Sequence, residues 1–424
     1  MFSTELYTHD MPNIINEFKY NIGEKHWIKR VKDLKKEIKG NPYLSDYLFK
    51  ENIISFELTR ICHYLNKGME ITSDNFKNGL YETIAFAAQI NSLISIYGSN
   101  KSKLIRRVHG AFKNPDDMRA LQLELLAATH FKRNGYEVSW PEANGNGNFD
   151  LYVNDIGKSG LEIECKSIGA DKGSKLHKRD IYEFYNIVSK IIRKNIKNIE
   201  YGLCILLTIN NRLTKVHEER IKIANTIKDH ISKDEISNKY DTFCINTKLF
   251  NIEQLNMNTI DNSLDVNFVE KISGTSNKEA VFIGNKHNIK GGILLVIQSK
   301  EQDNILSSIN KMISQSAKKQ VTRSKPALYV IGLNEINSQE LNELALSDIK
   351  NPTNATKLKI IGNNAIQSDT RKHVIGISFL DNGNFDKKDN TRTSRGSTSY
   401  TFLNRESIYW HNDFEALLNN SNVI

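Results

Sequence analysis

The sequence is poor in cysteine and proline and contains no long hydrophobic run. Its four cysteines form no CxxC pair, so neither a zinc-finger spacing nor a disulfide framework is indicated. The longest apolar runs, such as residues 203–207 and 293–297, are far shorter than the roughly 20 residues that cross a bilayer. A reducing, cytoplasmic environment without a membrane partner is therefore expected.

Several signatures of common enzyme classes are also missing. The N-terminal residues Met1 to Glu5 lack a basic segment followed by an apolar run, so no signal peptide is expected. No phosphate-binding P-loop, no GxSxG nucleophile elbow and no HExxH zinc motif occurs. P-loop nucleotide hydrolysis, α/β-hydrolase chemistry and zinc-protease chemistry are thus not indicated.

The chain is basic. Its 424 residues include 58 lysines and arginines against 49 aspartates and glutamates, a formal net charge of +9. A positive surface favours polyanionic partners, because binding a phosphate backbone releases counterions. We therefore expect a nucleic-acid partner, with DNA favoured over RNA, while the sequence leaves open a homodimer or a partner subunit.

The pattern of apolar residues predicts two regions. Residues 1–112 have the three- and four-residue spacing of amphipathic helices and predict a helical N-terminal domain. Residues 113–424 alternate between helical and strand patterns and predict one α/β domain. Within it, residues 251–290 are expected to be an irregular insertion and residues 381–399 a polar loop.

The most informative stretch runs from Glu124 to Lys166. Glu124 lies on an amphipathic helix that is predicted to begin near Pro115. A β-hairpin is expected further on, with its first strand at residues 149–153 and its second at 161–166. Because side chains of a strand alternate between its two faces, Glu164 and Lys166 share one face and Cys165 points to the other. Glu162 lies on the same face as Glu164 and Lys166, and its side chain is expected to be solvated.

This set of side chains suits phosphodiester hydrolysis. A hard divalent cation activates water and offsets the charge that develops on the phosphate oxygens, and Mg²⁺ needs only one or two carboxylates. Asp150 and Glu164 are the candidate direct ligands of Mg²⁺ or Mn²⁺, with the backbone carbonyl of Cys165 as a third. Lys166 is the candidate water activator. Glu124 is expected to reach the same cluster through a metal-bound water.

These residues resemble the PD-(D/E)XK, or restriction-endonuclease-like, nuclease superfamily. The resemblance rests on the helical Glu124, on Asp150 and on the triplet Glu164-Cys165-Lys166, although Phe149 stands where the family often has proline. It implies a mixed sheet flanked by helices in the order α-β-β-β-α-β. Residues 180–197 and 201–208 are expected to supply the last helix and strand. Proteins of this kind often act in restriction or phage defence.

Basic side chains directly follow the triplet and are candidates for binding the nucleic-acid backbone. They are Lys172, Lys175, His177, Lys178 and Arg179. Residues 101–113 and an arginine-bearing segment at 392–395 are further candidates. Other interpretations remain open. Residues 161–166 could form an edge strand with a solvated polar face. The protein could also bind nucleic acid without catalysis while retaining the fold, or be a toxin subunit that a partner holds inactive.

Overall fold

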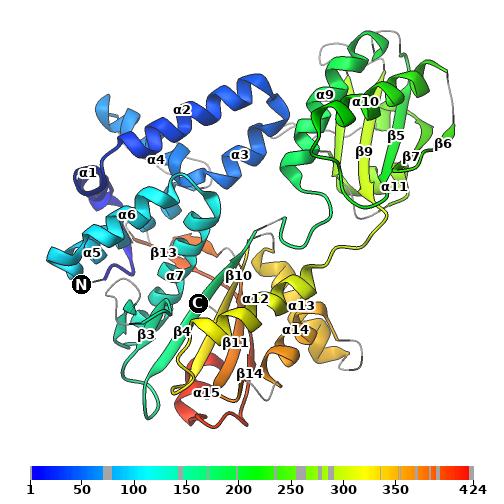
Figure 1. Cartoon of the computed structure of the whole chain (residues 1–424). Coiled ribbons are helices and arrows are strands. Elements are labelled where there is room, and N and C mark those ends of the chain that lie inside the picture. Colours follow the sequence, from blue (N-terminus) through cyan, green and yellow to red (C-terminus); the bar gives the residue numbers. More distant parts are fainter. Residues whose placement is uncertain are drawn as a thin grey trace. The chain divides into compact units, whose positions relative to one another are not determined.

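The computed structural model shows a mixed α/β protein, which confirms the general fold class (Figure 1). Within the described residues, two mixed sheets of six and five strands are accompanied by a small three-stranded sheet. The structure describes residues 2–69, 79–141, 147–169, 171–196, 199–233, 236–254, 264–275, 279–284, 291–334, 336–351, 353, 355–367, 371–381, 383–387 and 392–419.

The chain divides into two compact units. Unit 1 comprises Met1–Leu34, Phe49–Lys172 and Ile305–Ile424, and unit 2 comprises Lys35–Leu48 and Gly173–Asn304. These bounds differ from the predicted domains 1–112 and 113–424. The physical reason is that the N-terminal helices share one hydrophobic core with the helix and hairpin that follow them, so no boundary falls between them.

The N-terminal part is helical, as predicted, apart from the short strand β1 (Leu6–Tyr7). Its helices are α1 (Met11–Ile22), α2 (Lys25–Gly40), α3 (Ser45–Glu51), α4 (Ile53–Asn66), α5 (Leu80–Tyr97) and α6 (Ser102–Ala111). None of the helices in the described part of the chain has the length and hydrophobicity that a bilayer-spanning segment needs.

Helix α7 (Pro115–Arg133) begins where the sequence predicts. The Asn114 side chain accepts a hydrogen bond from the Asp116 amide at 3.1 Å, and Pro115 occupies the first turn. Asp116 and Asp117 place negative charge at the positive end of the helix dipole. Local sequence thus fixes the start of the helix that carries Glu124.

The sheet of unit 1 has the strand order β14-β11-β10-β4-β3-β2. Its strands are β2 (Val138–Ser139), β3 (Leu151–Val153), β4 (Leu161–Ile168), β10 (Ala327–Leu333), β11 (Val374–Leu380) and β14 (Ser399–Leu403). Strands β3 and β4 form the predicted antiparallel hairpin, and β4 pairs in parallel with β10 on its other side. The solvated edge-strand alternative is therefore wrong, because β4 lies inside the sheet.

The two faces of this sheet are covered by different helices. Ile163 and Cys165 of β4 pack in one core together with Leu121 and Leu125 of α7. The opposite face carries a second core, in which β10 and β11 pack with α12 (Ile305–Lys319) and α14 (Lys357–Ile366). The predicted alternation along β4 thus holds, with Cys165 facing α7.

The strand predicted at residues 201–208 forms, but its expected membership of the same sheet as the hairpin is wrong. That segment forms β5 (Gly202–Ile209), which belongs to the sheet of unit 2, and β10 takes the place beside β4. The helix predicted at 180–197 likewise forms α9 (Lys178–Ile196) of unit 2. Both β5 and β10 are apolar strands that can be covered on two faces, so hydrophobicity alone does not say which one pairs with β4.

Unit 2 is an α/β unit with its own sheet, in the order β6-β7-β5-β9-β8 (Figure 1). Its elements besides α9 and β5 are α10 (His217–Ser232), β6 (Ser237–Lys239), β7 (Phe243–Phe250), α11 (Val266–Ser273), β8 (Glu279–Gly284) and β9 (Gly292–Ser299). Helices α9 and α10 share one core with β5 and β9, and α11 belongs to a second core. Residues 173–304 therefore interrupt unit 1 between β4 and α12.

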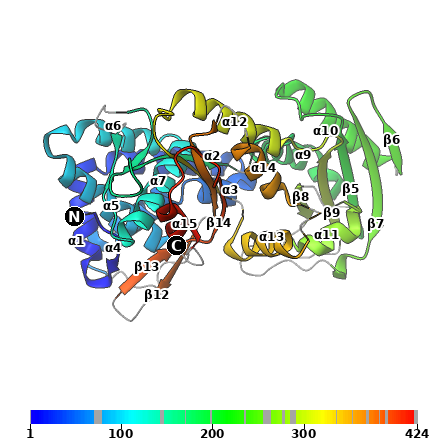
Figure 2. The same cartoon turned by 90° about the horizontal axis from the view of Figure 1, so that it is seen from below.

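Two segments expected to be irregular contain regular structure. The predicted insertion at 251–290 includes α11 and β8, although residues 255–263, 276–278 and 285–290 lie outside the described part. The predicted loop at 381–399 includes the antiparallel strands β12 (Asn384–Lys387) and β13 (Arg392–Gly396) (Figure 2). Strand β13 also pairs with β1. Polar composition misled here because strands of antiparallel sheets can also contain many polar residues.

Helices α13 (Ser338–Lys350) and α15 (Asn412–Asn419) complete unit 1. Helix α13 begins with a capping box, in which Asn337 and Glu340 each bind the other's backbone amide. The side chains of β13 lie outside the described part, so the predicted role of the arginines at 392–395 has no structural description.

Candidate active site

Asp150 lies at the entrance to β3, next to the middle of β4. In the antiparallel register Leu151 faces Ile163, which brings the residue before Leu151 beside Glu164. The Cys165 amide donates a hydrogen bond to Oδ2 of Asp150 at 2.8 Å. This bond fixes the carboxylate, which is 8% exposed, at the strand pair that carries the triplet.

Glu164 is completely buried on the face of the sheet that α12 covers. Its Oε1 atom forms an ion pair with Nζ of Lys166, whereas its Oε2 atom has no hydrogen-bond partner among the described residues. Burial and the neighbouring Asp150 raise the pKa of Glu164 to about 8, against the opposing effects of Lys166 and Ser316. Asp150 and Glu164 are therefore close enough to repel each other.

Lys166 lies two residues beyond Glu164 on the same face, as predicted. Burial disfavours its charge, but the carboxylates of Glu164 and Asp150 outweigh burial and raise the pKa of the ammonium. Its side chain is about a quarter exposed and is the most accessible of the predicted catalytic groups. Lys166 thus remains a cation, held beside Asp150 and Glu164.

Glu124 lies on α7, which covers the face of the sheet opposite to Glu164 and Lys166, and it is 2% exposed. Its partner is Arg107 of α6, whose Nη1 donates to Oε2 at 2.7 Å while Nη2 pairs with Oε1. This fork is the bidentate geometry that arginine and carboxylate favour. In the sequence Arg107 is one of several basic residues between positions 101 and 113. Nothing in that pattern predicts its ion pair with Glu124.

Cys165 lies at the centre of the predicted group. Its thiol is buried, and burial together with Asp150, Glu124 and Glu164 raises its pKa, while Lys166 opposes the shift. Cys165 itself was expected to offer its backbone carbonyl to a metal, but the described contact to Asp150 comes from its amide.

The donor set fits a hard divalent cation with many water ligands. Within the described residues, no group of three or more His, Cys, Asp or Glu side chains is arranged to hold a metal ion. The pair Asp150 and Glu164, with the unbonded buried Oε2 atom, is the number of carboxylates that Mg²⁺ commonly uses. A structural zinc site, which needs about four nitrogen or sulfur ligands, does not fit.

Several residues around the site were not predicted as part of it. Glu162, expected to be solvated, is 1% exposed and accepts hydrogen bonds from the Thr322 amide and hydroxyl at 2.8 and 2.5 Å. Tyr329 of β10 faces Glu164 in the parallel register and is also fully buried. These partners come from a segment more than 150 residues away, so no local pattern could have identified them.

The predicted nucleic-acid-binding residues are divided between the units. Lys172 ends the central segment of unit 1, whereas Lys175, His177, Lys178 and Arg179 belong to unit 2. Lys175 pairs with Glu301, and Arg179 pairs with Glu37 and Glu183. Acidic residues of unit 2 thus already neutralise part of this basic segment, and its role in binding nucleic acid stays a prediction.

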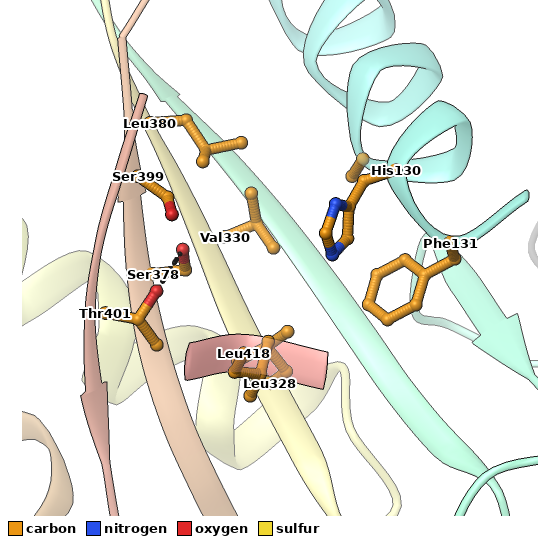
Figure 3. Close-up of a pocket in the computed structure, with 10 residues that line it drawn as sticks. His130, Phe131, Leu328, Val330, Ser378, Leu380, Ser399, Thr401 and Leu418 are labelled. Carbon is orange, nitrogen blue, oxygen red and sulfur yellow. Dashed lines mark hydrogen bonds between the residues drawn. The ribbon is translucent and has the colours of Figure 1, made fainter. Parts of the chain in front are cut away.

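A small pocket lies on the α7 face of the unit 1 sheet, beyond the candidate site (Figure 3). Its lining comes from α7, β10, β11, β14 and α15: Ala127, His130, Phe131, Leu328, Val330, Ser378, Leu380, Ser399, Thr401 and Leu418. Burial and Arg133 lower the pKa of His130 to about 4, so the imidazole is neutral near pH 7. None of the predicted catalytic residues lines this pocket.

Comparison with known proteins gives no match. No protein-family model, no curated protein and no solved structure matches the chain.

Proposed function

We propose that this protein is a divalent-metal-dependent nuclease that hydrolyses phosphodiester bonds, with DNA as the preferred substrate. The observation that carries the proposal is the placement of Asp150 beside Glu164 on neighbouring strands, with Lys166 in an ion pair with Glu164. Burying the carboxyl groups of Asp150 and Glu164 side by side costs stability, and ordinary packing of a sheet does not require it. Metal-assisted hydrolysis gives this arrangement a chemical reason.

The order of elements supports the same proposal. Helix α7, strands β2, β3 and β4, helix α12 and strand β10 follow one another as α-β-β-β-α-β once unit 2 is set aside. Asp150 directly precedes the second of these strands, and Glu164-Cys165-Lys166 lies on the third. This is the order expected from the resemblance to PD-(D/E)XK nucleases, with unit 2 as an insertion. Restriction or phage defence is the corresponding biological setting.

The proposed roles follow from position and charge. Asp150 and Glu164 would hold Mg²⁺ or Mn²⁺, which supplies an activated water and offsets charge on the phosphate oxygens. Binding would require Glu164 in its ionised form, and the metal would compete with Lys166 for this carboxylate. The Lys166 ammonium is then available to orient the attacking water and to stabilise negative charge on the phosphate.

Glu124 has a positioning role in this scheme. Its carboxylate is held by Arg107, and it contributes negative charge near the site without being a direct ligand. A hydrogen bond to a metal-bound water is the contact that its place on α7 would allow. Because the fork is bidentate, Arg107 also restricts the orientation of Glu124.

One observation favours a second candidate, a non-catalytic nucleic-acid-binding protein or a subunit that a partner activates. Glu124 and Glu164 are each engaged by a basic side chain, and both are buried almost completely. A site closed in this way has to rearrange before a phosphodiester reaches it. A protein that never rearranges would bind nucleic acid without cutting it.

The decisive experiment compares cleavage by the wild type with cleavage by site variants. Plasmid, linear duplex and RNA are incubated with the pure protein in Mg²⁺ and in Mn²⁺, beside Asp150→Asn and Lys166→Ala. Lys158→Ala, which removes an exposed lysine from the same hairpin, is the matched control. Cleavage that disappears in the two site variants and persists in the control supports the proposal.

Two other results separate the alternatives. Cleavage that persists in both site variants would place the active site elsewhere. Binding of nucleic acid without any cleavage, with or without added metal, would favour the non-catalytic protein.

A further inference from the structure

Tyr329 of β10 lies next to Glu164 in the interior of unit 1. The two residues face each other in the parallel register of β10 and β4, and both are fully buried. They lie on the face of the sheet that α12 covers, because Ile331 and Ile168 continue the same alternation and pack in the core with α12. Neighbouring strands lie roughly 4.8 Å apart, so the two side chains are within reach of each other.

The Tyr329 hydroxyl is a hydrogen-bond donor that has no acceptor among the described residues. Burial and the negative charge of Glu164 raise the pKa of this hydroxyl, so it keeps its proton and can donate it. Phenylalanine would fill the same space without a buried hydroxyl that lacks a partner. Packing alone therefore does not explain a tyrosine at this position.

Glu164 in turn has an acceptor that its neighbours leave unbonded. Lys166 pairs with Oε1 of Glu164, whereas Oε2 has no hydrogen-bond partner among the described residues. Ser316 of α12 lowers the pKa of Glu164, but its hydroxyl donates to the Gln320 side chain. The free donor on β10 and the free acceptor on β4 thus lie on the same face of adjacent strands.

We propose that Tyr329 is a positioning residue for Glu164, and that its hydroxyl donates a hydrogen bond to Oε2 when this carboxylate holds Mg²⁺ or Mn²⁺. The inference rests on the proposed function and deepens it at the same site. Carboxylates that bind a metal are usually hydrogen-bonded by another group, which fixes their orientation. Because the metal would compete with Lys166 for this carboxylate, a donor from β10 keeps Glu164 in place.

The test measures Mn²⁺ binding to the metal-free full chain by isothermal titration calorimetry at one fixed pH. Tyr329→Phe removes the hydroxyl and keeps the ring, so the core stays filled. We expect Mn²⁺ to bind this variant about tenfold more weakly, as is typical when a metal ligand loses its supporting hydrogen bond. The melting temperature without metal should not fall, because the metal-free protein loses no hydrogen bond of this hydroxyl.

Two further variants serve as controls. Tyr185→Phe in unit 2 also removes a fully buried hydroxyl without a hydrogen-bond partner among the described residues, and it should bind Mn²⁺ like the wild type. Asp150→Asn removes a proposed direct ligand and should abolish Mn²⁺ binding. This second control shows that the measured ion occupies the proposed site.

Wild-type Mn²⁺ affinity in Tyr329→Phe would overturn the inference. The proposed function would still stand in that case, if Asp150→Asn abolishes Mn²⁺ binding. Weaker binding together with a lower melting temperature, or an equal loss in Tyr185→Phe, would also overturn the inference, because damaged packing would explain it. Mn²⁺ binding that Asp150→Asn leaves unchanged would count against both proposals. A wild type that binds no Mn²⁺ would overturn the inference, and the cleavage assay would then decide the proposed function separately.

Discussion

Tyr329 and Glu164 occupy facing positions on the parallel strands β10 and β4. Neither the Tyr329 hydroxyl nor Oε2 of Glu164 has a hydrogen-bond partner among the described residues, and both side chains are fully buried. A buried polar atom without a partner costs roughly 1–3 kcal/mol. Their position beside Asp150 and Lys166 places this cost at the candidate active site.

Removing the Tyr329 hydroxyl should therefore not destabilise the metal-free protein. We expect Tyr329→Phe to leave the free energy of unfolding unchanged or to raise it by about 1 kcal/mol, as measured by urea denaturation. Tyr185→Phe in unit 2 is the matched control, because Tyr185 is also fully buried with an unbonded hydroxyl. A loss of stability in Tyr329→Phe alone would mean that this hydroxyl is hydrogen-bonded in solution.

The fork between Arg107 and Glu124 should contribute strongly to stability. Arg107→Ala leaves the buried Glu124 carboxylate without its guanidinium, and we expect a loss of about 3 kcal/mol. The double variant Arg107→Ala with Glu124→Ala should recover part of this loss, since no buried charge is left behind. A double-mutant cycle by urea denaturation measures the coupling; additive single effects would contradict a specific pair.

Glu57 of α4 should make stability depend on pH. Burial raises its pKa to about 7 in the folded protein, with Arg60 opposing, against an unfolded value near 4.5. The folded state thus favours the protonated form, so this contribution to stability is complete below about pH 4.5 and is lost as the pH rises through 7. Glu57→Gln, which cannot ionise, should gain about 1–3 kcal/mol over the wild type between pH 4.5 and pH 8. Denaturation of both proteins at the two pH values checks this, and a difference that does not vary with pH would refute it.

Gly160, directly before β4, should not tolerate a side chain. Its φ is +72°, and a Cβ atom there would lie 2.6 Å from the Val153 carbonyl oxygen, against the ring of Tyr152. We expect Gly160→Ala to cost more than 2 kcal/mol by thermal or urea unfolding, because conformational strain and the clash add. Gly135→Ala is the control, since φ is +88° there but nothing lies within 4 Å. Equal losses in both variants would show that the close contact is relieved without cost.

Local sequence was sufficient for the elements that carry the candidate site. The Asn114 cap with Pro115 fixes the start of α7, and the alternation from Leu161 to Lys166 fixes which side chains share a face. These features depend on neighbours a few residues apart, so they can be read without knowing the rest of the fold. The hairpin of β3 and β4 follows from the same kind of signal.

Tertiary structure alone decided which distant residues meet there. The sequence offered β5 and β10 as equivalent apolar strands, and only the assembled sheet selects β10 as the partner of β4. The same holds for the ion pair between Glu124 and Arg107 and for the hydrogen bond between Glu162 and Thr322. Such pairings depend on packing and burial between segments far apart in the chain, which local periodicity does not encode.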